Sequence, residues 1–187
     1  MDKSHFWKLI DDARRDVSSI GEVAGLLSEK LAEMDISDIL RWQQIFDAYF
    51  KISRKRKLWA AAYVIHGGCG DDCFDYFRAG LIALGRDVFL VALADPDSLA
   101  TVDVEDIEED LAGGEDMLYV GVQAYFKKLG MPEGYYERFD AACDEHAWSE
   151  DERQALAADI HFPPDIDLDW EEDELESVVP ALCAKFP

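Results

Sequence analysis

The stretch LWAAAYVIHGGCGDDCFDYFRAGLIALGRDV, residues 58–88, contains the features that decide the fold. Residues 58–65 are apolar almost all round and rich in alanine, which is typical of a buried central helix. Gly67-Gly68 follows, and glycines commonly end helices. Asp72 is placed to cap a second helix, whose apolar members are Phe74, Phe77, Leu81 and Leu84. The stretch therefore predicts two packed helices joined by a tight turn.

Helical periodicity continues on the N-terminal side of this stretch. Apolar residues recur at helical spacing from Ser4 to residue 17, over 21–34 and from Ser37 to residue 52, and the two serines are predicted caps. Residues 88–94 fit either a buried strand or a short helix. We predict a helix there, because no partner strand with period-two alternation occurs elsewhere.

The C-terminal half continues the helical pattern and then becomes acidic. We expect helices at 103–111, around 118–129 ending at Gly130, and at about 135–146 and 149–159. The sequence thus predicts an all-α, single-domain orthogonal helical bundle over residues 1–187, in which 163–179 form an acidic C-terminal tail.

Length, apolar runs and cysteine content indicate the number of domains and the cellular location to expect. A chain of 187 residues fits one ordinary domain. No basic region followed by an apolar run opens it, and the longest apolar stretches fall far short of the ~20 residues that span a bilayer. The four cysteines are few and scattered, which favours reduced thiols. We therefore expect a cytoplasmic protein.

Negative charge is concentrated in the second half of the chain. Residues 1–94 hold 14 acidic and 13 basic residues, a net charge of −1, whereas residues 95–187 hold 27 acidic and 5 basic residues, a net charge of −22. Such a surface disfavours nucleic acid and anionic membranes, because binding them requires exposed Lys and Arg. It suits a basic protein partner, although the acids could also serve mainly for solubility.

Several segments together resemble a known family. They are FWKLI at 6–10, the run 58–88 quoted above, DPDSLA at 95–100 and PALCAKF at 180–186. They are similar to the bacterial domain-of-unknown-function family 4240. The resemblance implies one all-helical domain over nearly the whole chain, and it brings no activity with it.

The sequence departs from the usual pattern of that family in three places. Gly70 stands where the family leads us to expect Ser, Gly80 where it leads us to expect a bulky aromatic residue, and the basic run 54–57 where a less basic loop is usual. Because glycine inside a helix is destabilising, Gly80 suggests the close approach of another element.

The turn from His66 to Cys73 is the first candidate site. It leads into a helix N-terminus, which attracts negative charge, but Asp71 and Asp72 would repel an incoming anion. One interpretation is structural, an Asp-capped turn with Arg78 pairing a carboxylate. The other is an active site, with Asp71 or Asp72 as general base and Arg78 holding a substrate.

Two metal hypotheses arise from the sequence. His66, Cys69 and Cys73 are ligand types that zinc prefers, but a structural site needs a fourth ligand, from Cys143, His146 or Cys183. Residues 165–176 imitate the acidic spacing of an EF-hand loop, but Trp170 occupies the position that requires glycine. Buried cysteines in the first case and weak, nonspecific divalent binding in the second are the simpler interpretations.

The basic run Arg54-Lys55-Arg56-Lys57 allows three interpretations. It could be a solvated loop, a nucleic-acid patch inside a strongly acidic chain, or an internal clasp that holds the acidic tail. The sequence does not decide among them.

Taken together, these features favour a non-catalytic protein-binding module, such as an inhibitor, adaptor or immunity-type protein, that meets a basic partner. Its predicted binding residues are Glu171, Glu172, Asp173 and Glu174. The alternative is a small enzyme with its site around the Gly67–Asp72 turn and Arg78. No common nucleotide or hydrolase motif is present, and no cofactor is predicted.

Overall fold

The computed structural model describes all residues except 16, 18, 103–113, 132–135 and 146–147, and the predicted helix at 103–111 lies outside the described residues. The N-terminal helices are α1 Lys3–Arg14, α2 Ile20–Glu33, α3 Ile36–Ile52, α4 Arg56–Ile65, α5 Asp71–Ala83 and α6 Arg86–Ala94. They are followed by η1 Pro96–Thr101, α7 Glu115–Leu129, α8 Tyr136–Glu145, α9 Glu150–Ala157, η4 Glu172–Glu174, α10 Leu175–Val178 and α11 Pro180–Lys185.

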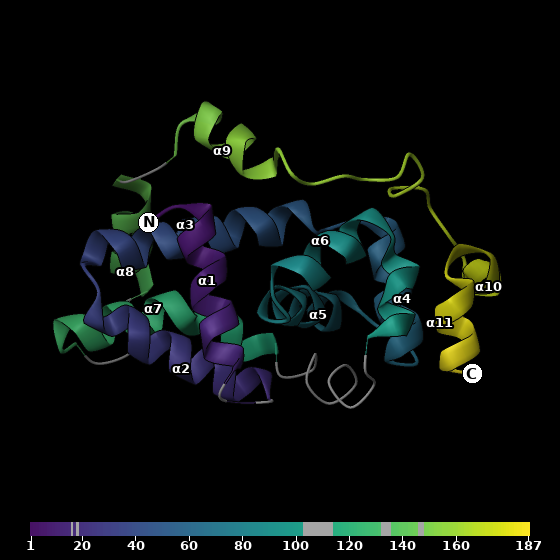
Figure 1. The fold of residues 1–187 in the computed structure, drawn as a ribbon, viewed down its shortest axis with the longest axis horizontal. Helices are drawn as coiled ribbons and strands as arrows, with labels where there is room; N and C mark the ends of the chain where they lie inside the picture. Colours follow the sequence, from purple (N-terminus) through teal and green to yellow (C-terminus); the bar gives the residue numbers. More distant parts are fainter. Residues whose placement is uncertain (16, 18, 103–113, 132–135, 146–147) are drawn as a thin grey trace.

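The fold is all-α and forms a single domain, as the sequence predicts, and the described residues contain no strand. Residues 88–94 are helical, within α6, and α7 ends at Gly130 in the left-handed conformation. Figure 1 shows α1 crossing α2 and α3, and α7 packs against both α2 and α3. One continuous hydrophobic core connects these helices.

An aromatic cluster forms the part of the core between α1, α3 and α6. The ring of Trp7 lies 4.9 Å from that of Tyr49 and 5.5 Å from that of Phe89, measured between centroids. The Trp7 indole N–H donates to the Tyr49 hydroxyl over 3.2 Å, so this buried polar pair is satisfied. Burial raises the pKa of Tyr49 to about 12, which keeps its hydroxyl neutral.

Two predicted helix caps differ from the observed ones. Asp2, not Ser4, caps α1, and its carboxylate accepts from the His5 backbone N–H over 2.9 Å. The N-cap position of α3 is Asp35 rather than Ser37, which lies inside the helix. In both cases an acidic residue two positions earlier starts the helix sooner, and Asp and Ser are both acceptable cap residues.

The start of α7 lies directly against α5. A Cβ atom added to Gly114 would lie 2.7 Å from the backbone nitrogen of Gly80 and closer still to the carbonyl oxygen of Tyr76. The absence of a side chain at Gly114 is what allows this approach to the α5 backbone. The close contact that Gly80 suggested from the sequence is therefore present.

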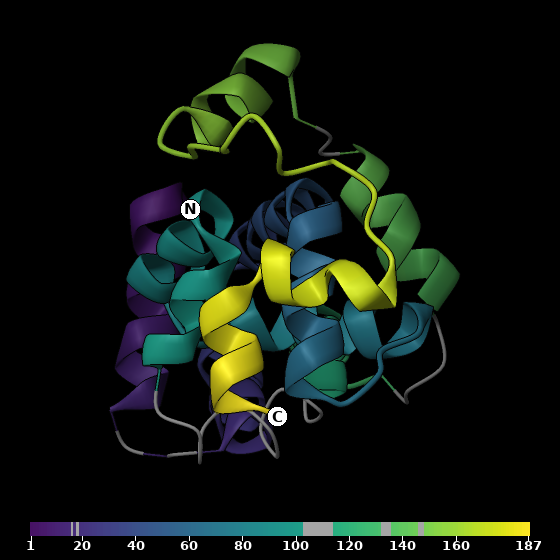
Figure 2. The same cartoon turned by 90° about the vertical axis from the view of Figure 1, so that its right-hand side faces the viewer.

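The C-terminal segment covers one side of α4. After α9 the chain runs in extended form along the outside of the molecule and ends in η4, α10 and α11, which pack against α4 and η1 (Figures 1 and 2). Helix α4 therefore lies toward one end of the molecule rather than at its centre. Its Leu58 and Ile65 are buried, while Tyr63 and Val64 are half-buried beside the C-terminal segment.

Candidate functional site

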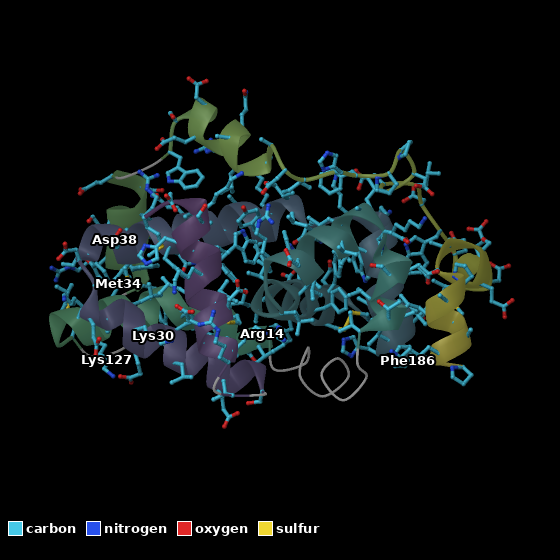
Figure 3. The ribbon with its side chains drawn as sticks, in the orientation of Figure 1. Arg14, Lys30, Met34, Asp38, Lys127 and Phe186 are labelled. Atoms are coloured by element: carbon cyan, nitrogen blue, oxygen red, sulfur yellow. A yellow bond between two sulfur atoms is a disulfide. The ribbon has the colours of Figure 1, made fainter. Side chains whose placement is uncertain are left out.

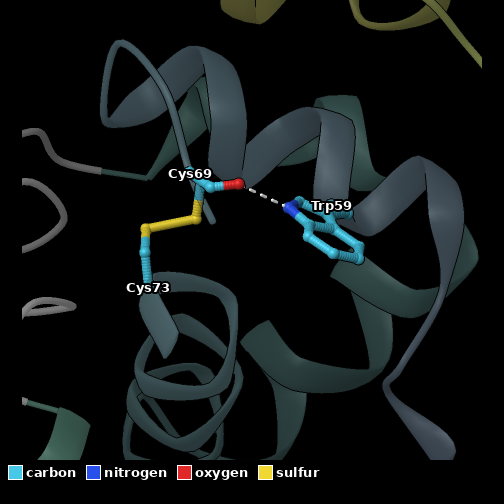
Figure 4. The surroundings of a disulfide bond; sticks show 3 residues. All are labelled: Trp59, Cys69 and Cys73. Atoms are coloured by element: carbon cyan, nitrogen blue, oxygen red, sulfur yellow. Dashed lines mark hydrogen bonds between the residues drawn. A yellow bond between two sulfur atoms is a disulfide. The ribbon is translucent and has the colours of Figure 1, made fainter. Parts of the chain in front are cut away.

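The turn between α4 and α5 is fixed by glycines and backbone hydrogen bonds. Gly67 and Gly68 have φ of 62° and 127°, values that favour glycine, and the Gly68 N–H donates to the Tyr63 carbonyl over 2.8 Å. The Cys69 carbonyl then accepts a 2.8 Å hydrogen bond from the Trp59 indole (Figure 4). The turn is thus anchored to α4.

A disulfide joins Cys69 to Cys73, so the expectation of reduced thiols is wrong for this pair. The two residues span the junction between the turn and the first turn of α5, where their Cα atoms are 5.3 Å apart, a separation that suits a disulfide. Cys143 and Cys183 are free and partly buried. The argument from scattered cysteines excluded a framework of several disulfides, but it did not consider one disulfide between two cysteines four positions apart.

The disulfide also contradicts the zinc hypothesis, because a disulfide sulfur is not the thiolate that zinc binds. His66 lies at the end of α4, and His146 is outside the described residues. In the part of the chain that the structure describes, no three His, Cys, Asp or Glu side chains are grouped so that they could hold a metal ion.

Arg78 is buried, and its contacts connect α5 to the end of α3. Only 2% of it is exposed, and its guanidinium donates to the Phe50 carbonyl at the end of α3 and to the Asp75 carboxylate. It also lies over the Phe50 ring at 3.8 Å and the Phe74 ring at 5.1 Å. Burial lowers the pKa of Arg78. Because both Nη atoms are engaged inside the protein, Arg78 is not placed to hold a substrate.

Asp71 and Asp72 are exposed at the start of α5. Asp71 pairs with Arg54 over 2.9 Å, and the same arginine reaches Asp75 at 3.3 Å. The cap predicted at Asp72 is wrong, because α5 begins at Asp71 and the N-cap position is Gly70, with no side-chain cap bond. The N-cap is therefore two residues earlier than the predicted one, because the extended Gly70 backbone already leads into the helix.

The basic run holds the acidic tail, as the clasp interpretation expects. We use the name clasp for the three ion pairs Lys55–Asp167 at 2.6 Å, Arg56–Asp169 at 2.5 Å and Lys57–Asp165 at 3.2 Å. The aspartates that imitated an EF-hand loop are therefore paired with side chains. The solvated-loop interpretation is wrong for these three bases.

Backbone and apolar contacts reinforce the clasp. The Lys57 N–H donates to the Ile166 carbonyl over 2.9 Å, and the Trp170 indole donates to the Arg56 carbonyl over 2.8 Å. Ile166 itself is buried. The hydrogen bond from Lys57 lowers the pKa of Asp165, so the ionised form is favoured. The tail is thus held in one register along the start of α4.

Neutralising the clasp should loosen the tail without unfolding the core. We expect Asp165→Asn, Asp167→Asn and Asp169→Asn together to lower the melting temperature by a few degrees and to reduce its dependence on salt, since exposed ion pairs are weak and screened. Thermal unfolding at two salt concentrations measures both effects.

The matched control for that variant is Glu171→Gln, Asp173→Asn and Glu174→Gln, which changes the same number of charges five or six positions further along the chain. These acids have no ion pair with a Lys or Arg of the described chain. The control should keep the parent melting temperature. Equal losses in the two variants would show that the clasp contributes nothing specific.

A groove of about 810 Å³ lies between the end of α4 and the C-terminal segment. Its apolar lining includes Val64, Leu175 and Phe186, and its acidic lining is Glu172, Asp173 and Glu176. Figure 3 shows Phe186 at this end of the molecule, far from Asp38 at the other. The groove joins the predicted turn, through His66 and Gly67, to the predicted acidic binding segment.

The tail acids fall into two groups in the structure. Of the eight acids in 163–179, a stretch without Lys or Arg, three belong to the clasp. Those at 171–174 are exposed, and among the described residues none of them pairs with Lys or Arg. Glu172 accepts a hydrogen bond from the Tyr63 hydroxyl, and this bond raises the pKa of Tyr63. Of the four residues predicted to bind a partner, Glu172 and Asp173 therefore line the groove.

The fold and the groove define the molecule as an all-α single-domain protein with an acidic concave face. The chain belongs to the family described as a protein of unknown function, DUF4240, whose model matches residues 1–127. The match ends within α7, so the segment that closes the groove lies beyond it. Neither a curated protein nor a solved structure matches the chain closely enough to indicate relationship.

The helices of the described chain do not have the properties of a membrane span. Within the described ranges, none of them has both the length and the apolar character needed to cross a bilayer.

Proposed function

We propose that this protein is a non-catalytic module that binds a basic protein partner through Glu171, Glu172, Asp173 and Glu174. The observation that carries the proposal is the division of the tail. The clasp neutralises the aspartates at 165, 167 and 169 and fixes the chain, while the next four acids form no ion pair with a Lys or Arg of the described residues, although Lys185 also lines the groove beside them. An inhibitor, an adaptor and an immunity-type protein would all use such a surface.

The geometry favours a Lys or Arg side chain of the partner as the group that is bound. The stem of such a side chain can lie along the apolar lining at Val64 and Phe186, while its charged end reaches Glu172 or Asp173. Charge-assisted hydrogen bonds to carboxylates are the strong ones. Because the clasp already orders the tail, binding does not have to bear that entropic cost.

The alternative, a small enzyme at the turn, has less support. Arg78 is buried with its Nη atoms engaged, and Asp71 faces Arg54. His66 does line the groove together with Glu172, so an acid–base site there would have to use those two residues.

We also propose that the protein is located in the cytoplasm.

Neutralising the four acids should weaken binding to a basic partner. We expect Glu171→Gln, Glu172→Gln, Asp173→Asn and Glu174→Gln together to slow association with an immobilised arginine-rich peptide roughly tenfold at low salt, because steering by complementary charge is lost. The rate for the parent protein should fall as salt rises, and that of the variant should change less. Surface plasmon resonance at two ionic strengths measures both rates.

A control with the same change of net charge tests whether position matters. Glu137→Gln, Asp140→Asn, Asp144→Asn and Glu145→Gln remove four exposed acids from α8. This variant should associate nearly as fast as the parent. If the two variants lose the same rate, overall charge explains the binding and the proposed surface is wrong. Pull-down from native lysate at the same two salt concentrations would then identify the natural partner.

A further inference from the structure

The Cys69–Cys73 disulfide is not needed to hold the turn in place. A crosslink across four positions closes a very short loop and so constrains the unfolded chain little. The turn is already held by the Gly68 N–H bond to Tyr63 and by the Trp59 indole bond to the Cys69 carbonyl. These contacts would keep the two sulfur atoms adjacent after reduction, so the bond can open and close without a large rearrangement.

The helix after the disulfide is positioned independently as well. The ring of Phe74, the residue after Cys73, stacks on Trp59 with centroids 4.8 Å apart and planes at 10°. The Phe74 N–H donates to the Gly70 carbonyl over 2.9 Å. Figure 4 shows the disulfide beside the start of α5, with Trp59 on the opposite side of Cys69. The backbone on both sides of the disulfide is therefore held by contacts other than the bond between the two cysteines.

The two cysteines differ in exposure. Only 8% of Cys69 is exposed, whereas Cys73 is half-buried and stands at the third position of α5. No side chain caps the first N–H groups of this helix, and such groups stabilise a thiolate. The carboxylates of Asp71 and Asp72 oppose that effect, and Arg54 partly offsets Asp71. Cys73 is thus the more exposed residue of the pair and the one that an external thiol reaches more readily.

From these contacts we propose that Cys69 and Cys73 form a reversible thiol–disulfide exchange site, in which Cys73 is the sulfur attacked by an external thiolate. The inference does not depend on the proposed binding function. The co-reactant is a low-molecular-weight thiol, or its disulfide in the reverse direction.

The exchange balances in two steps. A thiolate attacks Sγ of Cys73, forming a mixed disulfide, and the Cys69–Cys73 bond breaks so that Cys69 leaves as a thiolate and takes a proton from water. A second thiolate attacks the external sulfur of the mixed disulfide and releases the Cys73 thiolate, which takes the second proton from water. Two external thiols are thereby oxidised to one disulfide while the protein gains two electrons and two protons.

The first test is a redox titration of the folded chain with Cys143→Ser and Cys183→Ser, which removes the two free thiols. The protein is equilibrated in buffers of reduced and oxidised glutathione, and its thiols are then trapped with a maleimide and counted by mass spectrometry. We expect a reversible change of two thiols while the helical circular dichroism stays constant. If the pair is reduced only in denaturant, or if helix is lost with reduction, the bond is a structural crosslink and the proposal fails.

The second test assigns the attacked sulfur and uses the same background. Cys69→Ser leaves Cys73 alone, and Cys73→Ser leaves Cys69 alone, so the two variants are matched controls for each other. We expect the variant that keeps Cys73 to form a mixed disulfide with oxidised glutathione at least about tenfold faster, because its sulfur is accessible. Equal rates, or a faster reaction at Cys69, would overturn the assignment. Circular dichroism of both variants checks that each is folded.

Discussion

Replacing Arg78 by alanine should lower the free energy of unfolding by about 3 kcal/mol or more, because it breaks a buried charged contact and leaves its partners without a donor. The Phe50 carbonyl and Asp75 lose their hydrogen bonds, and a void opens between the Phe50 and Phe74 rings. Denaturation in urea, followed by circular dichroism, measures the change.

Arg54→Ala is the matched control for that change. Arg54 also reaches Asp75, but it is about half exposed, so its loss should cost less than about 1 kcal/mol. The comparison separates burial from charge, since both variants remove an arginine that pairs with the same carboxylate. An Arg78→Ala protein as stable as the parent but lacking a measurable activity would contradict the structural role and revive the enzyme alternative.

Gly114→Ala should strongly destabilise the protein, because the added methyl group meets the backbone of α5. The new Cβ would lie 2.7 Å from the Gly80 nitrogen and 2.9 Å from the Tyr76 carbonyl carbon, both backbone atoms that cannot rotate away. We expect a loss of about 3 kcal/mol of stability, at the upper end of overpacking effects, because α7 must shift away from α5.

Gly25→Ala should have the opposite effect on stability. Gly25 lies inside α2, is exposed, and would place its Cβ with nothing within 4 Å. Alanine there should stabilise the protein by about 0.5–1 kcal/mol, because glycine loses more entropy in a helix. Urea midpoints of the two variants should therefore move in opposite directions. A neutral Gly114→Ala would mean that the two helices are not in close contact.

The fold was predictable from sequence because helical periodicity is a local signal. The apolar spacing in residues 58–84 gave α4 and α5, and the lack of any alternating strand was enough to assign residues 88–94 to a helix, observed as α6. The exact N-cap residues could not be predicted, and the predictions at Ser4, Ser37 and Asp72 were each two residues too late. Asp, Ser and Gly are all favourable N-cap residues, and in each case another of them stands two positions earlier.

The candidate site was predictable only in its parts. The charge pattern alone allowed three interpretations of the basic run at 54–57. The clasp could not be predicted, because its aspartates are more than 100 positions away in the sequence and only the folded chain brings them to the basic run. Arg78 was named from the sequence, but its burial against Phe50 depends on how α3 meets α5. The groove has the same origin, because its two walls come from opposite halves of the chain.

The docking of α11 onto η1 determines when the groove can exist. Both carboxylate oxygens of Asp97 accept from the backbone N–H groups of Ala181 and Leu182, each over 2.9 Å, and the first of these partners is 84 positions away. The Lys185 ammonium adds bonds to the carbonyls of Ala100 and Val102. During synthesis, α4 and η1 leave the ribosome long before this latch is made. A nascent chain can thus fold α4 and η1 while still lacking one wall of the groove, and the groove is complete only when the last helix docks.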